Sequence, residues 1–126
     1  SRRQRQMCKE TGLVAGDQSN RSDSAISIND SGKLTIGYKY SGYSSITTKA
    51  VITTYIEKKT LGLFWKRVDI GKTNNEWIDT INDYRYTGSR THQLSSSGTY
   101  RVTVIYNIYG SGGSADEITC QATDSY

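Results

Sequence analysis

The stretch between residues 97 and 123 constrains the fold more than any other part of the chain, because it reads as two strands joined by a glycine-rich turn. Successive side chains of an extended strand point to opposite faces. The first strand therefore has one apolar face, formed by Tyr100, Val102, Val104, Tyr106 and Ile108. The sequence GSGGS at 110–114 contains glycines that adopt positive φ without steric cost, so the chain can reverse there. A second strand is predicted to return beside the first, with Ile118, Cys120 and Ala122 in phase.

The remaining sequence contains shorter apolar stretches separated by polar turns. Candidate strands lie at 25–28, 33–40, 48–59, 65–70 and 91–94. The segment 71–90 is polar and contains no candidate strand, and a single helical turn near 75–81 is considered there, although Asn, Asp and Thr are weak helix formers. Together with the hairpin these stretches make about seven strands, at spacings typical of a β-sandwich, and an open barrel is the alternative architecture.

Length and the distribution of polar residues predict one β domain. A chain of 126 residues suits a single domain with one core. Residues 1–24 are mostly polar and are expected to form an irregular N-terminal segment, which places the β-sandwich domain at 25–126.

The net charge of +4 is concentrated at the N-terminus. The first ten residues carry four basic side chains and one acidic side chain, so most of the excess lies in this segment. Because the basicity belongs to a terminal segment, nucleic acid is not expected as a partner. No apolar run approaches the ~18 residues of a membrane-spanning helix.

The chain has two cysteines, Cys8 and Cys120, near opposite ends of the sequence. With a single histidine they are too few for a structural zinc site, so a disulfide is predicted between them. A bridge that closes a loop of about 110 residues is worth about 4–5 kcal/mol in chain entropy. The alternative is a buried, free Cys120. Because a disulfide needs an oxidising compartment, the protein is predicted to be secreted or exposed at a cell surface.

One segment resembles a corner found in immunoglobulin-like and fibronectin-like sandwiches. It reads SGTYRVTV at 97–104, and Tyr100 stands near the start of the penultimate predicted strand. In that class a tyrosine at this place folds its hydroxyl back onto the preceding corner. The resemblance implies an all-β fold with a single immunoglobulin-like β-sandwich. It does not extend to antibody domains, because Val102 stands where they have a core cysteine.

The order of motifs is also similar to that of a group of small secreted β-rich proteins of Gram-positive bacteria. The motifs are SGKLTI at 31–36, a β-branched strand and charged hairpin at 50–59, WKRV at 65–68, an Asn-rich stretch, SGTYRVTV and the Gly-Ser-rich turn. The resemblance spans about residues 31–119. It implies a bacterial, secreted protein, and it implies no particular function because members of the group have none assigned.

The sequence contains no pattern that identifies an enzyme or a metal centre. His92 is the single histidine, and a Ser-His-Asp arrangement with Asp79 or Asp83 would follow from composition alone. Asn82 and the two aspartates fit turn chemistry better than a calcium loop, because the glycine and terminal glutamate of an EF-hand are missing. We therefore predict a non-enzymatic protein without a cofactor or metal.

Two surfaces are candidates for ligand binding. The first combines aromatic rings with amide groups and suits a sugar or a protein epitope; its residues are Trp77, Asn82, Tyr84 and Tyr86. Its alternative is that Trp77 caps the core. The second is an apolar hairpin tip with cationic flanks, which suits a partner's groove or a membrane surface; its residues are Leu61, Leu63, Phe64 and Trp65. Trp65 is expected to pack inward, with Leu61 and Phe64 partly exposed.

The leading prediction for function is a non-enzymatic secreted or cell-surface binding module for a protein or glycan. The alternative is a secreted membrane-active or bacteriocin-like effector that acts through the apolar tip and the basic residues around it.

Overall fold

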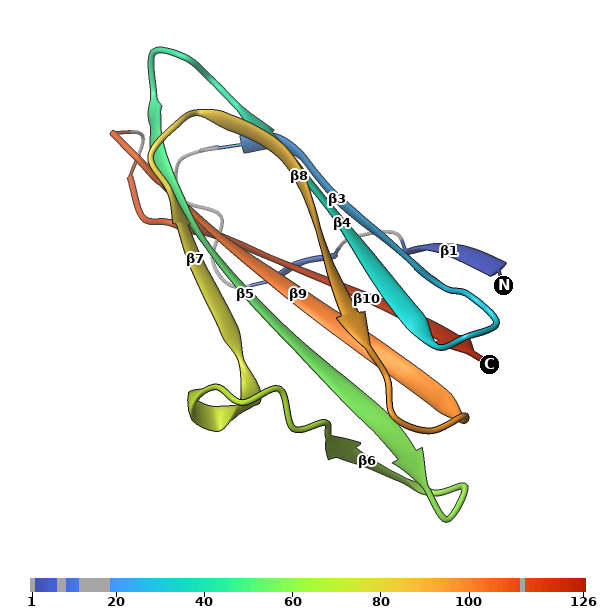
Figure 1. Cartoon of the computed structure of the whole chain (residues 1–126). Coiled ribbons are helices and arrows are strands. Elements are labelled where there is room, and N and C mark those ends of the chain that lie inside the picture. Colours follow the sequence, from blue (N-terminus) through green and yellow to red (C-terminus); the bar gives the residue numbers. More distant parts are fainter. Residues whose placement is uncertain (1, 7–8, 12–18, 112) are drawn as a thin grey trace.

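Two antiparallel sheets lie face to face and enclose one apolar core (Figure 1). The computed structural model describes residues 2–6, 9–11, 19–111 and 113–126, with side chains from residue 22 onward. Within those residues there is no α-helix, and helical geometry is limited to a 3₁₀ turn at Thr73–Asn75. The prediction of an all-β fold is therefore confirmed.

The smaller sheet has four strands in the order β1-β3-β4-β8. They are β1 (Arg2–Gln6), β3 (Ser19–Ile28), β4 (Lys33–Gly42) and β8 (Arg85–Gln93). A tight turn joins β3 to β4, with Gly32 at a φ of 85° and its N–H donating to Asn29 O at 3.0 Å. β8 follows much later in the chain and forms the last strand of this sheet.

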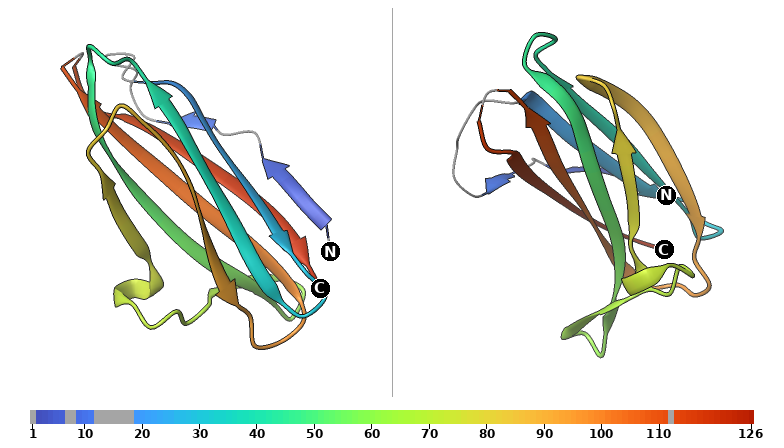
Figure 2. Two further views of the ribbon diagram at one scale, coloured as in Figure 1. Left: turned by 45° about the horizontal axis from the view of Figure 1, so that its top comes forward. Right: turned by 90° about the vertical axis from the view of Figure 1, so that its left-hand side faces the viewer.

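The larger sheet has six strands, and its strand β5 pairs with two of them along one edge. The order is β2-β10-β9-β5, after which β6 pairs with one end of β5 and β7 with the other. The connection from β7 to β8 carries the chain to the smaller sheet (Figure 2). The strands are β2 (Lys9–Thr11), β5 (Thr47–Thr60), β6 (Phe64–Arg67), β7 (Trp77–Ile81), β9 (Thr99–Gly110) and β10 (Asp116–Ser125).

The core is built from the inner faces of both sheets. On β9 the predicted apolar series is buried, with 2% exposure or less for each of Tyr100, Val102, Val104, Tyr106 and Ile108. β10 lies antiparallel beside β9 with its own apolar residues on the same face, so the predicted hairpin is confirmed. The smaller sheet contributes a matching row of Ile26, Ile28, Leu34, Ile36, Tyr38 and Tyr40.

The structure has strands where the sequence predicts none. β1, β2 and the first part of β3 lie within 1–24, so the expected boundary at residue 24 does not separate an irregular segment from a β domain. β7 and most of β8 lie within 71–90, where the sequence predicts no strand and at most a helical turn. These two strands place polar residues such as Asp79 and Arg90 between the sheets, so the apolar alternation that marks a strand is missing.

The corner before β9 has the hydrogen bond that the sandwich resemblance implies. The Tyr100 hydroxyl donates to the carbonyl oxygen of Ser96 at 2.5 Å. Its ring stacks on Tyr126, with centroids 6.4 Å apart. Lys58 covers the same corner, because its Nζ donates to Ser96 Oγ at 2.6 Å and lies 5.7 Å from the Tyr100 ring centroid. The corner therefore ties the start of β9 to β5 and to the C-terminal residue.

The hydroxyl of Tyr106 joins the two sheets. Tyr106 belongs to β9 of the larger sheet, is 0% exposed, and reaches across the core to β3 and β4. Its hydroxyl donates to Asp23 O at 2.8 Å, accepts from the Lys39 N–H at 3.1 Å, and lies 3.0 Å from Ser24 Oγ. Asp23 and Lys39 are opposite each other in the β3–β4 register, so one hydroxyl bridges both strands. Burial raises the pKa of Tyr106 to about 12.

Cys120 is buried on β10 with 1% exposure. Its predicted partner, Cys8, lies outside the described residues, so the disulfide stays a prediction. The neighbouring register supports it, because Lys9, which follows Cys8, is opposite Thr119, which precedes Cys120.

We expect Tyr106→Phe to lower the free energy of unfolding by about 1–3 kcal/mol, because the backbone groups of Asp23 and Lys39 lose a buried partner. Urea denaturation measures the change. The pKa of Tyr106 rises from 10.0 to about 12 on folding, so its contribution is fully present below pH 10 and is lost as the pH rises towards about 12. The variant should therefore decline less steeply in this window. Tyr43→Phe, at a residue that is 38% exposed, is the control, and equal alkaline profiles for all three proteins would contradict the assignment.

We expect the oxidised protein to contain a Cys8–Cys120 disulfide. Peptide mapping without reductant should recover the two cysteine peptides as one species, which reduction separates. Cys8→Ser should lower the free energy of unfolding by about 2–5 kcal/mol under oxidising conditions. In the presence of reductant the wild type and the variant should unfold alike. Two titratable thiols in the denatured, unreduced wild type would contradict the prediction.

Candidate functional site

The turn between β5 and β6 carries the two most exposed large apolar side chains of the described residues, Leu61 and Leu63, and the exposed Phe64 follows them. Leu61 is 83% exposed, Leu63 76% and Phe64 61%. We call these three residues the apolar tip, and it projects from the larger sheet at the lower right of Figure 1. Burying such a side chain is worth about 1.5–3 kcal/mol, so three of them in water at one place form a surface suited to contact with another molecule.

The backbone of the apolar tip is unfavourable for leucine. Leu61 has a φ of 56° and Gly62 a φ of 67°, and the Leu63 N–H donates to Thr60 O at 3.1 Å. Positive φ at both central residues is the pattern of a type I′ turn, which favours Asn, Asp and Gly. A left-handed conformation costs an ordinary residue roughly 1–2 kcal/mol, and the exposed Leu61 side chain gains little packing in return. Strain of this kind at an exposed apolar residue points to a contact outside the chain.

Basic side chains surround the apolar tip. Lys59 precedes it on β5, and Lys66 and Arg67 follow it on β6, all three exposed. Lys66 lies opposite Lys58 in the register. An anionic surface beside an apolar groove would complement this arrangement.

Trp65 lies on the outer face of the larger sheet, so its predicted inward packing is wrong. It stands opposite Lys59, and the Lys59 Nζ lies 5.8 Å from its ring centroid. Arg101 of β9 also contacts this ring, with its guanidinium carbon 4.4 Å from the same centroid. The strand register decides the face, because a residue of β6 shares the orientation of the β5 residue opposite it.

Charged and aromatic side chains alternate across the base of this hairpin. Arg101 on β9 forms an ion pair with Glu57 on β5 at 2.7 Å, besides its contact with Trp65. Arg67 on β6 lies 3.6 Å from the ring centroid of Tyr55 on β5. Cation–π contacts at exposed sites are worth about 0.5–1 kcal/mol each. Together these contacts hold β6 against β5 and β9, and the apolar tip projects from a braced base.

The four residues predicted as an aromatic ligand site do not form one site. Trp77 begins β7, whereas Asn82 and Tyr84 lie in the turn that follows β7 and Tyr86 lies on β8. A strand advances about 3.3 Å per residue, so Trp77 and the turn are at opposite ends of β7. Trp77 packs against the core, as its capping alternative predicts. The exposed Asn82 and the half-buried Tyr84, with Arg85 over its ring at 5.4 Å, stay together at the turn.

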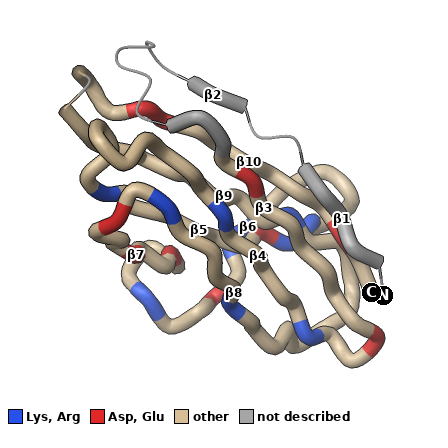
Figure 3. The backbone as a smooth tube through the Cα atoms, turned by 90° about the horizontal axis from the view of Figure 1, so that it is seen from above, with Lys and Arg blue, Asp and Glu red and all other residues tan. Residues whose placement is uncertain are grey.

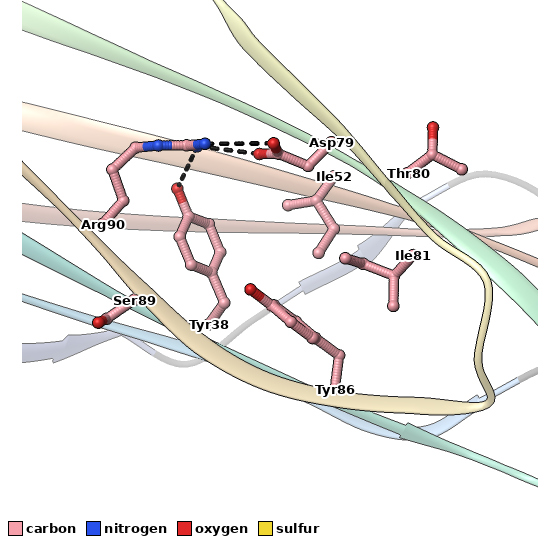
Figure 4. A pocket seen from close by; sticks show the side chains of 8 residues that line it. All are labelled: Tyr38, Ile52, Asp79, Thr80, Ile81, Tyr86, Ser89 and Arg90. Carbon is pink, nitrogen blue, oxygen red and sulfur yellow. Dashed lines mark hydrogen bonds and ion pairs between the residues drawn. The ribbon is translucent and has the colours of Figure 1, made fainter.

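A cavity of about 160 Å³ lies between the edges of the two sheets beside Tyr86 (Figure 4). Asp79 of β7 and Arg90 of β8 meet there through hydrogen bonds of 2.9 and 3.2 Å, and Arg90 also donates to the Tyr38 hydroxyl at 3.4 Å. The cavity is smaller than the roughly 300 Å³ at which small-molecule sites begin. It is lined by Tyr38, Ile52, Asp79, Thr80, Ile81, Tyr86, Ser89 and Arg90.

The residues considered for catalysis or metal binding have structural contacts. His92 packs edge-on against Trp77 with centroids 5.6 Å apart, and burial lowers its pKa. Asp79 is paired with Arg90. The Asp83 carboxylate accepts from the N–H of Tyr84 at 2.7 Å, which is turn chemistry. In the described part of the chain, no group of three or more His, Cys, Asp and Glu side chains could hold a metal ion.

No protein-family model matches the chain, and no curated protein sequence matches it significantly.

The described residues include no helix long and apolar enough to cross a membrane. Basic and acidic residues are interspersed over both sheets (Figure 3). The apolar tip brings together three of the six exposed large apolar side chains of the described residues.

We expect Leu61→Asn to raise the free energy of unfolding by roughly 0.5–1 kcal/mol, because asparagine tolerates the left-handed backbone of this turn better than leucine does. Chemical denaturation measures the change. Leu63→Asn is the matched control, since Leu63 is similarly exposed but has no positive φ, and it should bring no gain. A loss of stability in Leu61→Asn would show that the leucine side chain has a structural role.

Proposed function

We propose that this protein is a non-enzymatic, secreted or cell-surface binding module that recognises a protein through the apolar tip. One observation carries the proposal: Leu61 is held 83% exposed in a left-handed turn where leucine is disfavoured. Neither folding nor solubility gains from that choice of residue. A partner that buries Leu61 together with Leu63 and Phe64 supplies hydrophobic free energy that offsets the cost of the left-handed backbone.

The chemistry of the apolar tip favours a protein over a glycan. Sugars are bound by flat aromatic rings together with groups that hydrogen-bond to hydroxyls. The tip offers two leucines and one phenylalanine, all exposed, and no polar side chain between Leu61 and Phe64. Such side chains fill a preformed apolar groove and act as anchors of a protein interface. Because Lys59 and Lys66 lie next to the tip, the groove should have an acidic rim.

We also propose that the two sheets form an immunoglobulin-like or fibronectin-like sandwich and that the protein is secreted or exposed at a cell surface. The Tyr100–Ser96 corner supports the immunoglobulin-like and fibronectin-like sandwich class. The strand orders support the same class: with β9 as the strand that follows the tyrosine corner, β3-β4-β8 and β10-β9-β5 correspond to the A-B-E and G-F-C neighbours of immunoglobulin-like sandwiches. Secretion follows from the predicted disulfide, which needs an oxidising compartment.

A membrane-active effector is the second candidate function, and the basic residues beside the apolar tip favour it. An anionic bilayer surface also combines an apolar interior with negative charge. Three apolar side chains on one short turn are a small membrane anchor, whereas they suffice as the centre of a protein interface. The protein partner is therefore preferred.

We expect Phe64→Asp to weaken capture of the protein partner tenfold or more, because a charge would enter the centre of the interface. Immobilised wild type and variants are compared on surface proteins extracted from the producing cells and their neighbours, with quantification of each retained protein. Ile78→Asp is the matched control, since Ile78 on β7 is 62% exposed, much like Phe64, and lies outside the apolar tip. Equal retention by both variants would refute the proposal. Sedimentation with anionic vesicles that Phe64→Asp abolishes would favour the membrane alternative.

A further inference from the structure

The outer edge of β8 is open in the described part of the chain. The four-stranded order ends at β8, and within the described part of the chain no strand pairs with its second edge (Figure 2). Native proteins protect such edges with short strands, charged side chains, proline, bulges or inward-pointing charges. β6 is four residues long and contains Lys66 and Arg67, and β7 is five residues long. β8 is nine residues long, lacks lysine and proline, and pairs with β4 without a register shift. Its two arginines are Arg85 at the start of the strand and the inward-pointing Arg90, whose charge is paired with Asp79.

The register shows which backbone groups of β8 face that open edge. The hydrogen bonds from Gly42 N to Tyr84 O and from Leu94 N to Gly32 O continue the β4–β8 ladder at its two ends. Hydrogen-bonded and non-hydrogen-bonded pairs alternate along an antiparallel ladder. The even-numbered residues of β8 therefore bond to β4. The N–H and C=O groups of the odd-numbered residues point away from it, and these residues are Arg85, Thr87, Ser89, Thr91 and Gln93.

The side chains of the same residues suit pairing with an identical strand. The outward-facing side chains are exposed and mostly small and polar: Thr87, Ser89 and Thr91 stand between Arg85 and Gln93. An antiparallel copy centred on Ser89 would place Thr87 opposite Thr91 and Arg85 opposite Gln93. Thr–Thr pairs are favourable across antiparallel strands, and no like charges face each other.

Hydrogen bonding and charge favour the register centred on Ser89, here called the centred register, over the registers shifted along the strand. Because only odd-numbered residues present free backbone groups, the register can shift only in steps that keep odd residues opposite odd residues. A shift that centres the pair on residue 90 would oppose two arginines. In the centred register Arg90 faces Gly88, and its charge stays paired with Asp79 of its own chain at 2.9 Å. The centred register also uses the whole length of β8.

We propose that the protein self-associates into a two-fold symmetric dimer in which β8 pairs antiparallel with β8 of a second copy, with the axis at Ser89. Five hydrogen-bonded residue pairs along the two strands supply about ten backbone hydrogen bonds between the chains. The two four-stranded sheets become one continuous sheet. An isologous contact of this kind closes on itself and leaves neither edge of β8 free, which also prevents further edge-to-edge aggregation. The edge of β8 is separate from the apolar tip, so the dimer does not depend on whether the tip binds a protein.

Sedimentation velocity of the full chain from micromolar to millimolar concentration tests the dimer. Ser89→Pro removes the N–H at the axis without removing a bond to β4, so it should weaken the dimer tenfold or more while the monomer stays folded by circular dichroism. Ser89→Ala keeps the N–H and should dimerise like the wild type. A wild type that is monomeric throughout the range, or a folded Ser89→Pro that dimerises normally, would overturn the proposal.

Charge swapping tests the register without a proline. The double variant T87K/T91K places lysine opposite lysine in the dimer, and T87E/T91E places glutamate opposite glutamate, so each alone should associate at least tenfold more weakly than the wild type. Mixed together they should form a heterodimer, because each lysine then faces a glutamate. Failure of the mixture to associate would overturn the centred register. Amide exchange is a further readout: Thr87, Ser89 and Thr91 should gain protection on dimerisation, whereas Gly88 and Arg90 are protected in the monomer as well.

Discussion

The hydroxyl of Tyr106 is the contact on which the arrangement of the two sheets depends. A sandwich held only by apolar side chains leaves the sheets able to shift relative to each other, because hydrophobic contact has no direction. The Tyr106 hydroxyl is directional: it donates to Asp23 O and accepts from Lys39 N on two strands of the opposite sheet. Tyr38 to Thr54 at 2.8 Å and Ile28 N to Asp124 at 3.0 Å add two further polar links across the core. These links fix the position of one sheet relative to the other. That position determines which residues form the outer surfaces.

The apolar tip and its base show how one hairpin separates stability from recognition. Its base is held by contacts among Glu57, Arg101, Trp65, Arg67 and Tyr55, which use charge and ring faces. Its end has an unfavourable backbone and three apolar side chains in water. A stable base with an unstable end is the distribution expected where a rigid scaffold presents a contact surface.

The edges of the two sheets differ in how far they are protected against pairing with another strand. β6 and β7 share one edge of β5 and are short, so little unpaired backbone is exposed there. β8 stacks beside β7 through the Asp79–Arg90 pair and the His92–Trp77 contact, which fix its inner face. The outer edge of β8 has no such protection within the described residues, and its row of small polar side chains suits a further strand.

The sequence by itself determined the hairpin of β9 and β10 and the burial of its apolar series, because alternation and turn glycines act locally. The Tyr100 corner was implied by the resemblance to immunoglobulin-like and fibronectin-like sandwiches. The sequence also identified the tip at 61–65, where apolar residues interrupt a charged hairpin. Only the tertiary structure showed that β7 and the first part of β8 are strands, since their inner residues Asp79 and Arg90 pair with each other across two sheets instead of packing in the core. It likewise decided that Trp65 faces outward and that Leu61 adopts a left-handed turn. The β5–β6 register places Trp65 on the same face as Lys59, and whether that face is inside or outside depends on the pairing of β5 with β9, which is distant in sequence.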